Sequence, residues 1–171
     1  MSIIYLAAGC FWGAQRYFDC LAGVIKTEVG YANGRTAAPT YEQVKHENTG
    51  HAETVCVEFD PEKITLSELL QQYFKVIDPV SLNRQGGDVG TQYRTGIYYT
   101  DPADLDTIEA EFGKLAANYN EPLAVEIKSL DNFYTAEEYH QKYLDKNPTG
   151  YCHISPKMFE EARGFRPKTK G

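Results

Sequence analysis

Short apolar runs of strand length alternate with amphipathic helical stripes along most of this chain, and this alternation limits the possible folds. Residues 2–8 form an apolar run that is typical of a strand in the middle of a sheet. From Leu66 to Ile77 apolar side chains recur at helical spacing, and Thr65 and Glu68 form a capping box in front of them. Strands and helices that alternate in this way pack as layers around one core.

We therefore expect an α+β fold, a two-layer α/β sandwich with a ferredoxin-like core, long active-site loops and an irregular C-terminal tail. Strands are predicted over residues 2–8, 24–29, 52–59, 94–100 and 122–128. Helices are predicted over residues 11–22 and 66–77, from Asp101-Pro102 onward, and after a cap of Thr135 and Glu138, with Tyr139, His140 and Tyr143 on the inner face.

The length of 171 residues predicts a single domain over residues 1–171, with a tail at 147–171. The net charge of −7 argues against a nucleic-acid partner, because no basic run is present to neutralise phosphates. No apolar stretch could span a membrane, and the N-terminus lacks the features of a signal peptide. We expect a soluble cytoplasmic protein, and a monomer.

The chain has four cysteines but no C-x-x-C motif. In a reducing compartment these cysteines are not expected to form structural disulfides. Cys152, His153, His46 and His51 match no standard metal-site spacing, so we expect neither a metal nor a cofactor. The remaining Cys20 and Cys56 have the character of small packing residues.

Cys10 lies where the first strand gives way to the first helix. A helix N-terminus stabilises a thiolate, which predicts a lowered thiol pKa and a nucleophile. The alternative is a buried, inert cysteine. Phe11 and Trp12 would form an apolar wall beside the sulfur, although core packing is expected for at least one of the two rings.

Glu53 shares a strand face with Val55, Val57 and Phe59. On that core face a carboxyl group is desolvated, so its pKa should rise and the group could act as a general acid. The alternative is that Glu53 lies in water at a frayed strand end.

Long connections remain at residues 30–51 and 78–93 and in the tail, and such loops are usually functional or disordered. They carry residues that could line a site, namely Tyr31, Tyr41, Arg84, Asp88, Tyr93, Tyr151 and Cys152. A cysteine on a tail, such as Cys152, could resolve a sulfenic acid formed on another cysteine.

Several motifs together resemble the peptide methionine sulfoxide reductase A family. They are GCFWG (9–13), TEVGYANG (27–34), TGHAE (49–53), LNRQGGDVGTQYR (82–94), AEEYHQKYL (136–144) and NPTGYC (147–152), in the family's order over nearly the whole chain. Asn33 replaces the first of a frequent glycine pair, and asparagine tolerates the left-handed conformation that such a turn uses.

The resemblance implies reduction of the S epimer of methionine sulfoxide, free or in oxidised proteins. It implies Cys10 as the nucleophile and Glu53 as the acid, with Tyr41 and Tyr93 holding the sulfoxide oxygen. By the same resemblance Asp88 belongs to the polar network, while Phe11 and Trp12 hold the substrate methyl group and Tyr151 packs nearby. It further implies a Cys10–Cys152 disulfide that thioredoxin reduces.

Two other functions are compatible with a reactive Cys10. A thiol peroxidase would need a polar pocket with a basic residue beside the thiolate, whereas an apolar wall and an acid are expected here. A non-catalytic module that binds a methyl thioether would keep its function when Cys10 is replaced by serine.

Overall fold

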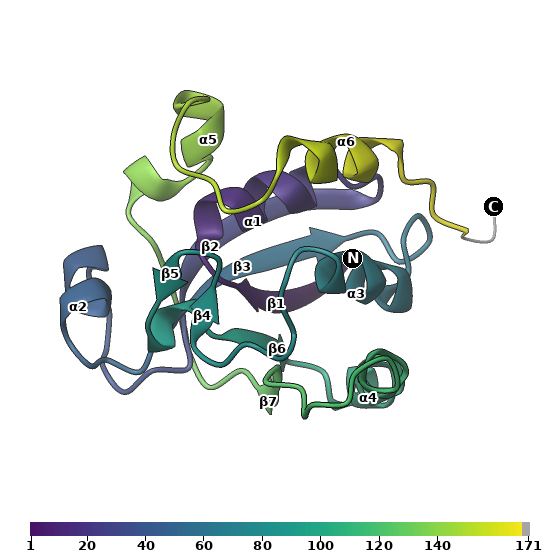
Figure 1. Ribbon diagram of the computed structural model, residues 1–171. Helices are drawn as coiled ribbons and strands as arrows, with labels where there is room; N and C mark the ends of the chain where they lie inside the picture. Colours follow the sequence, from purple (N-terminus) through teal and green to yellow (C-terminus); the bar gives the residue numbers. More distant parts are fainter. Residues whose placement is uncertain (169–171) are drawn as a thin grey trace.

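The computed structural model describes residues 1–168, which fold around one six-stranded sheet (Figure 1). The strands are β1 (Ser2–Ala8), β2 (Val24–Ala32), β3 (Ala52–Phe59), β6 (Thr95–Tyr99), β7 (Glu126–Ser129) and β8 (Phe133–Thr135), in the order β7-β6-β1-β3-β2-β8. A separate ribbon pairs β4 (Arg84–Gln85) with β5 (Asp88–Val89). The helices are α1 (Phe11–Asp19), α2 (Tyr41–His46), α3 (Leu66–Phe74), α4 (Leu105–Ala116), α5 (Tyr143–Lys146) and α6 (Pro156–Gly164).

The four inner strands confirm the predicted ferredoxin-like core. In chain order β1, α1, β2, β3, α3 and β6 give the β-α-β-β-α-β arrangement, and neighbouring strands in β6-β1-β3-β2 are antiparallel. β1 lies inside the sheet, as its apolar sequence predicts. The helices α1, α3 and α4 pack on one face of the sheet, where the main core lies. No helix of residues 1–168 is long and apolar enough to cross a membrane.

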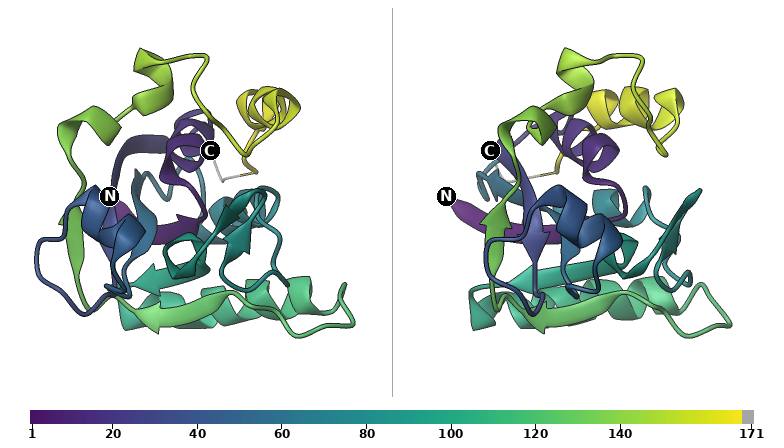
Figure 2. Two further views of the ribbon diagram at one scale, coloured as in Figure 1. Left: turned by 60° about the vertical axis from the view of Figure 1, so that its left-hand side comes forward. Right: turned by 90° about the vertical axis from the view of Figure 1, so that its left-hand side faces the viewer.

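The sheet is curled, because only residues 130–132 connect strands at its two opposite edges, β7 and β8. In a flat sheet of six strands the edges would lie about 24 Å apart, at about 4.8 Å for each neighbouring pair. The connection spans at most about 14 Å. In Figure 2 the chain rises from the end of the green β7 along the other side of the sheet. Alanines line the inside of this curl, at Ala7, Ala32 and Ala52, and leave room for Tyr98.

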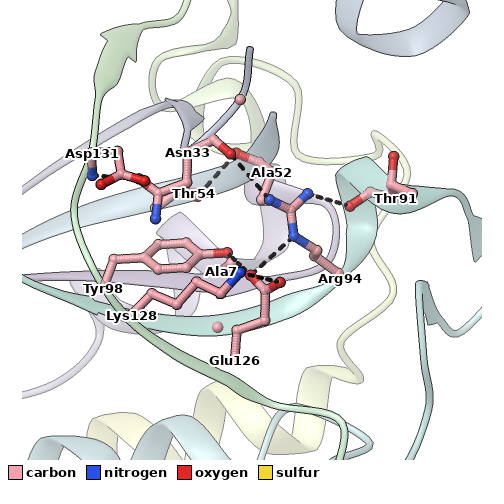
Figure 3. Close-up of polar contacts among 12 residues, drawn as sticks. Ala7, Asn33, Ala52, Thr54, Thr91, Arg94, Tyr98, Glu126, Lys128 and Asp131 are labelled. Carbon is pink, nitrogen blue, oxygen red and sulfur yellow. Dashed lines mark hydrogen bonds and ion pairs between the residues drawn. The ribbon is translucent and has the colours of Figure 1, made fainter. Parts of the chain in front are cut away.

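The face of the sheet on the inside of the curl, opposite the helices, is called the curled face below. Hydrogen bonds between polar side chains connect its strands (Figure 3). The Arg94 Nε donates to the Glu126 Oε2 over 3.0 Å, and the Tyr98 hydroxyl donates to the same oxygen over 2.7 Å. The Arg94 Nη2 also donates to the backbone oxygen of Asn33, and the Asn33 Oδ1 accepts from the Asp131 amide over 2.7 Å. These bonds join β6 and β7 to the end of β2, across the open side of the curl.

The prediction of an irregular tail was wrong for residues 156–164, which form α6. Pro156 starts this helix at a position where no amide donor is needed. Met158, Phe159 and Ala162 then recur at helical spacing and pack on the core beside α1. The predicted domain (1–171) and tail (147–171) both include residues 169–171, which lie outside the described residues.

The predicted helix after Thr135 was also wrong. Thr135 ends β8, where it pairs with Gly30, and only single turns follow at residues 138–140 and in α5. Gln141 explains the break, because its side chain accepts from the Val29 amide over 3.0 Å and donates to the Val29 oxygen over 2.9 Å. The following Lys142 is left-handed, with φ 54°. The Gln141 side chain thus occupies the edge of β2, and the backbone around residues 141 and 142 does not continue as a helix.

The other predicted elements exist with shifted ends. The capping box of Thr65 and Glu68 starts α3, but α3 ends at Phe74 and α1 at Asp19, both earlier than predicted. The third helix begins as a short turn over residues 102–104 before α4, and the strand predicted at 122–128 is β7. The loop at 30–51 contains the unpredicted α2, which has its own capping box of Thr40 and Gln43.

Candidate active site

Cys10 lies at the junction of β1 and α1, as the N-cap residue of α1. The preceding Gly9 has φ +81°, a backbone conformation that favours glycine. A Cβ atom at Gly9 would also lie 2.7 Å from the Cβ of Gln85. The turn therefore needs glycine for two reasons, and it places Cys10 under the β4–β5 ribbon with 7% of its surface exposed.

Glu53 lies on the core face of β3 and is 2% exposed, as the alternation along the strand predicts. Its Oε1 accepts a hydrogen bond from the Phe11 amide, the first residue of α1, over 3.1 Å. Burial raises the pKa of Glu53 to about 8, and the Phe11 hydrogen bond opposes that rise only in part. At neutral pH this carboxyl group therefore carries a proton.

The expected low pKa of Cys10 was wrong. Burial, and secondarily the charge of Glu53, hold the thiol pKa well above its ordinary value. The Trp12 amide at the start of α1 acts in the opposite direction but does not outweigh them. The helix N-terminus does lower the pKa of Cys10, but the desolvation that raises it is the larger effect. In the free protein the thiol of Cys10 and the carboxyl of Glu53 both favour their neutral forms.

Tyr41 from α2 and Tyr93 from the turn before β6 bring two hydroxyl groups to the same site. Burial is the main cause that raises both pKa values, that of Tyr41 to about 12, and the charges of Glu53 and Cys10 add to each. Neither hydroxyl has a hydrogen-bond partner within residues 1–168. Both can therefore donate to a ligand atom placed between them and Glu53.

The two aromatic residues after Cys10 take different positions. The ring of Phe11 is buried in the core against Tyr31, with ring centroids 5.7 Å apart. The indole of Trp12 stacks on Tyr143 at 3.8 Å and donates from Nε1 to the Nδ1 of His140 over 2.9 Å. The Phe11 ring therefore belongs to the core, as expected for at least one of the two rings, and His140 and Tyr143 orient the half-buried Trp12. Sequence reasoning assigned those two residues to a helix face rather than to the site.

Asp88 comes to the site on the β4–β5 ribbon, and its charge contributes to the raised pKa of Glu53. The Tyr151 hydroxyl of the tail donates to the Asp88 Oδ2 over 3.0 Å. The ribbon is fixed by the buried Gln85, whose side chain accepts from the Asp78 amide over 2.8 Å and donates to the Asp78 oxygen over 3.0 Å. Of the predicted loop residues, five are near enough to Cys10 to interact with its charge, namely Tyr41, Asp88, Tyr93, Tyr151 and Cys152. Arg84 is instead exposed, and the Tyr31 hydroxyl donates to Glu137 over 2.8 Å.

Cys152 is half-buried and, like the other three cysteines, is not in a disulfide. Its Sγ donates to the Ile154 oxygen over 3.3 Å. A Cβ atom at Gly13 would lie only 2.9 Å from this sulfur, so the tail packs directly on α1 near its start. Cys20 and Cys56 are also half-buried, in agreement with their expected role in packing.

The histidines at 46 and 51 lie apart from this cluster of side chains. His51 is buried, and its Nε2 donates to the Thr36 oxygen over 2.7 Å, which fits a structural histidine. His46 is exposed on α2 beside Glu42. Among residues 1–168, no three histidine, cysteine, aspartate or glutamate side chains are grouped so that they could hold a metal ion.

Relatives of known name share the sequence over most of the chain. The sequence model of the family described as peptide methionine sulfoxide reductase matches residues 2–169. Peptide methionine sulfoxide reductase MsrA of Lachnoclostridium phytofermentans is 59% identical over 160 residues, which are 94% of this chain and 96% of the relative. The MsrA of Mycoplasma pneumoniae is 54% identical over 90% of this chain and 98% of its own length.

Solved structures agree with these sequence matches. Mxr1 from Saccharomyces cerevisiae in reduced form superposes with a TM-score of 0.83 at 38% identity, over 90% of this chain and 91% of Mxr1. Methionine sulfoxide reductase A of Corynebacterium diphtheriae gives 0.79 at 40% identity, over 88% of this chain and 76% of that one. Because the family model matches residues 2–169 and both the sequence and the fold agree with known members, this chain belongs to the peptide methionine sulfoxide reductase family.

Proposed function

We propose that this chain reduces methionine S-sulfoxide, free or within oxidised proteins, to methionine, and so repairs proteins after oxidation. It would act as a monomer in the cytoplasm, without a metal or a cofactor. The observation that carries the proposal is the buried Glu53 carboxyl, whose pKa burial raises to about 8 and which is close enough to Cys10 to affect the thiol pKa. A sulfoxide is a poor electrophile until its oxygen receives a hydrogen bond or a proton.

Two neutral groups that can give up a proton, the Cys10 thiol and the Glu53 carboxyl, are suited to the reduction of the sulfoxide, the first step of the cycle. The sulfoxide oxygen would lie between Glu53 and the free hydroxyls of Tyr41 and Tyr93, which donate hydrogen bonds to it. Glu53 gives its proton to that oxygen while the Cys10 sulfur attacks the sulfoxide sulfur, and the thiol proton replaces the one that Glu53 has lost. The substrate sulfur–oxygen bond and the new sulfur–sulfur bond then break as the oxygen passes, as hydroxyl, to the Cys10 sulfur. The products are methionine and a sulfenic acid on Cys10, so the substrate sulfur is reduced and the Cys10 sulfur oxidised.

Trp12 supports selection of a methylthio group. Its ring is held in one orientation by the stack on Tyr143 and the hydrogen bond to His140, which gives the substrate methyl group a fixed apolar surface. Phe11 contributes to this site in two ways: its backbone amide donates a hydrogen bond to Glu53, and its buried ring packs in the core beneath the site. Asp88 and Tyr151 close the opposite side with polar groups.

Cys152 supports the second half of the cycle. Its thiol would attack the Cys10 sulfenic acid and release water, which leaves a Cys10–Cys152 disulfide. We propose thioredoxin as the reductant of this disulfide. A complex of yeast Mxr1 with Trx2 has been solved, and Mxr1 is the protein whose reduced form this chain resembles at 38% identity.

A single-turnover experiment tests the proposal. Reduced protein is mixed with each epimer of methionine sulfoxide in the absence of reductant, methionine is quantified, and disulfides are mapped by peptide mass spectrometry. We expect about one methionine per chain, from the S epimer only, with Cys10 joined to Cys152. The absence of methionine with both epimers would contradict the proposed activity.

The Cys152→Ser variant separates the two halves of the cycle. We expect it to release one methionine per chain at the rate of the unsubstituted protein but not to turn over with thioredoxin. Normal steady-state rates with thioredoxin would contradict the role of Cys152 as the resolving cysteine. A matched Cys20→Ser variant, at another half-buried cysteine, should lose neither step.

A further inference from the structure

His153 is a half-buried imidazole that the proposed cycle has not used. Its Nε2 lies 3.1 Å from the backbone oxygen of Ala8, the last residue of β1. A carbonyl oxygen only accepts, so Nε2 must carry the proton, and in the neutral ring Nδ1 is then an acceptor. This Nδ1 is buried and has no hydrogen-bond partner in the described part of the chain. Buried acceptors without partners are rare, and each one needs an explanation.

The free Nδ1 and the sulfur of the proposed resolving cysteine, Cys152, both lie near the first turn of α1. A Cβ atom at Gly13 would lie 3.6 Å from the Nδ1 of His153 and 2.9 Å from the Sγ of Cys152. The nitrogen and the sulfur thus flank one point on the first turn of α1. On its other side, the ring lies against Gly9, where a Cβ atom would be 3.5 Å from Nε2. The imidazole therefore lies along the turn that carries Cys10, beside Gly9 and Gly13.

We propose that His153 is the general base that activates Cys152 in the resolving step. The inference rests on the proposed function. The thiol of Cys152 gives its proton to Nδ1 of His153 and attacks the sulfur of the Cys10 sulfenic acid. A sulfur–sulfur bond forms, the sulfur–oxygen bond of Cys10 breaks, and the proton on Nδ1 passes to the departing oxygen, which leaves as water. The sulfenic acid is the oxidant, so no further reactant is needed.

Cys152 needs such a base, because burial raises the pKa of its thiol and leaves little thiolate at neutral pH. In the reduced protein its S–H group donates to Ile154, so the proton must be transferred before attack. Burial lowers the pKa of His153, which keeps the ring neutral and its Nδ1 able to accept. The charge of Asp88 and the hydrogen bond to Ala8 act in the opposite direction, and they would stabilise the imidazolium during the step.

The His153→Gln variant tests the proposal, because glutamine can keep a donor to the Ala8 oxygen while it lacks a base at the Nδ1 position. In rapid-quench single turnovers with the S epimer, three quantities are followed: methionine released, sulfenic acid trapped by dimedone, and disulfide formed. We expect methionine release within twofold of the unsubstituted protein, accumulation of sulfenic acid, and disulfide formation slowed by ~10²-fold or more. Disulfide formation slowed by less than threefold would overturn the proposal.

The control is His46→Gln, the same chemical change at an exposed histidine of α2, which should alter neither step. Methionine release reports on the proposed function, and the delay between methionine and disulfide reports on His153, so the two failures can be distinguished. If the unsubstituted protein releases no methionine, the proposed function itself has failed.

The unsubstituted protein provides a second test should the His153→Gln variant not fold. The rate of disulfide formation after methionine release is measured from pH 5 to 9. It should rise with loss of a proton from a group at or below the ordinary histidine pKa of about 6.5 and stay level to pH 8. A rate that still rises tenfold between pH 7 and pH 8, as for an unassisted thiol, would overturn the proposal. The other titratable or charged groups that surround this ring and the two thiols are Arg16, Tyr41, Glu53, Asp88, Tyr93 and Tyr151.

Discussion

Two glutamates on opposite faces of the sheet have opposite shifts in pKa. Glu53 on the helix-covered face is 2% exposed, and its hydrogen-bond partner among the described residues is the Phe11 amide. Glu126 on the curled face is half-buried and binds the Arg94 guanidinium over 3.0 Å and the Tyr98 hydroxyl over 2.7 Å. Burial raises the pKa of Glu53 to about 8, whereas the partners of Glu126 lower its pKa.

Burial opposes ionisation at both positions, so the partners decide the role of each carboxyl group. Glu126 is ionised and joins strands that the curl brings together, which is a structural use of charge. Glu53 forms no ion pair within residues 1–168, and the charge of Lys45 lowers its pKa less than burial raises it, so it stays protonated, which is the form that a general acid needs. The helix-covered face thus carries a carboxyl group suited to chemistry, and the curled face one suited to stability.

Replacement of Glu53 should give the largest effect. Glutamine has the same shape but no transferable proton, so we expect Glu53→Gln to lower kcat by ~10²–10⁴, the usual contribution of a general acid. Steady-state reduction of methionine S-sulfoxide with thioredoxin measures this effect. A loss of only twofold would remove Glu53 from the role of acid.

The same carboxyl group should make stability depend on pH. The folded protein holds the Glu53 proton up to about pH 8, whereas the unfolded chain loses it near 4.5. Between these values the folded state binds one more proton, so its free energy of unfolding should fall as pH rises, by about 1.4 kcal/mol per pH unit from this group. The contribution is fully present below pH 4.5 and is lost once pH passes through 8.

Denaturant unfolding of the unsubstituted protein and of Glu53→Gln, at pH 5, 6.5 and 8, isolates the contribution of Glu53 to the free energy of unfolding. The difference between the two proteins should change by a few kcal/mol across the series, since glutamine does not titrate. A constant difference would mean that Glu53 is already ionised at pH 5.

On the curled face, Glu126→Gln should change stability and not chemistry. The substitution leaves the Arg94 guanidinium, 13% exposed in its side chain, without its counter-charge, so we expect a loss of about 1–3 kcal/mol. The kcat should stay within twofold, because Glu126 lies on the face away from Cys10. A large fall in kcat with unchanged stability would break the division between the two faces.

The parts of this molecule that sequence predicts are those set by local periodicity. The alternation along β3 places Glu53 on the core face without any knowledge of what covers it, and the capping box of Thr65 predicts the start of α3. The departures come from partners distant in sequence. Gln141 breaks a predicted helix because it binds the edge of β2, and the pKa of Cys10 rises because the surrounding structure desolvates it.

The resemblance to a family brought residues of the site together by motif and implied Glu53 as the acid, but the raised pKa of Cys10 became evident only in the structure. His140 and Tyr143 were assigned to an ordinary helix face, and a helix there would have hidden their contact with Trp12. The sequence did not predict the ion pair of Glu126, because Arg94 and Tyr98 come into contact with it only when β6 and β7 pair. A role that depends on which charges meet across a curled sheet needs the structure.

Asn33 offers the finest test of the curled face. It has φ 54°, a left-handed conformation, and its side chain accepts from the Asp131 amide and donates to the Ser129 oxygen over 3.1 Å. Asn33→Gly keeps the favourable backbone but loses both bonds, which should cost about 1 kcal/mol at this half-buried position. Asn33→Ala loses the same bonds and adds the left-handed strain of a side chain, so it should cost about 1–2 kcal/mol more.

Denaturant unfolding of the two Asn33 variants measures the cost of the left-handed backbone strain, since both variants lack the same side-chain hydrogen bonds. Equal stabilities would show that the backbone of residue 33 has left the left-handed region, and that the connection after β7 no longer holds it. Methionine release should be unchanged in both variants, because the bonds lost lie on the curled face. A slower release would instead mean that the closure of the curl also positions Glu53, and that the two faces are coupled through β2 and β3.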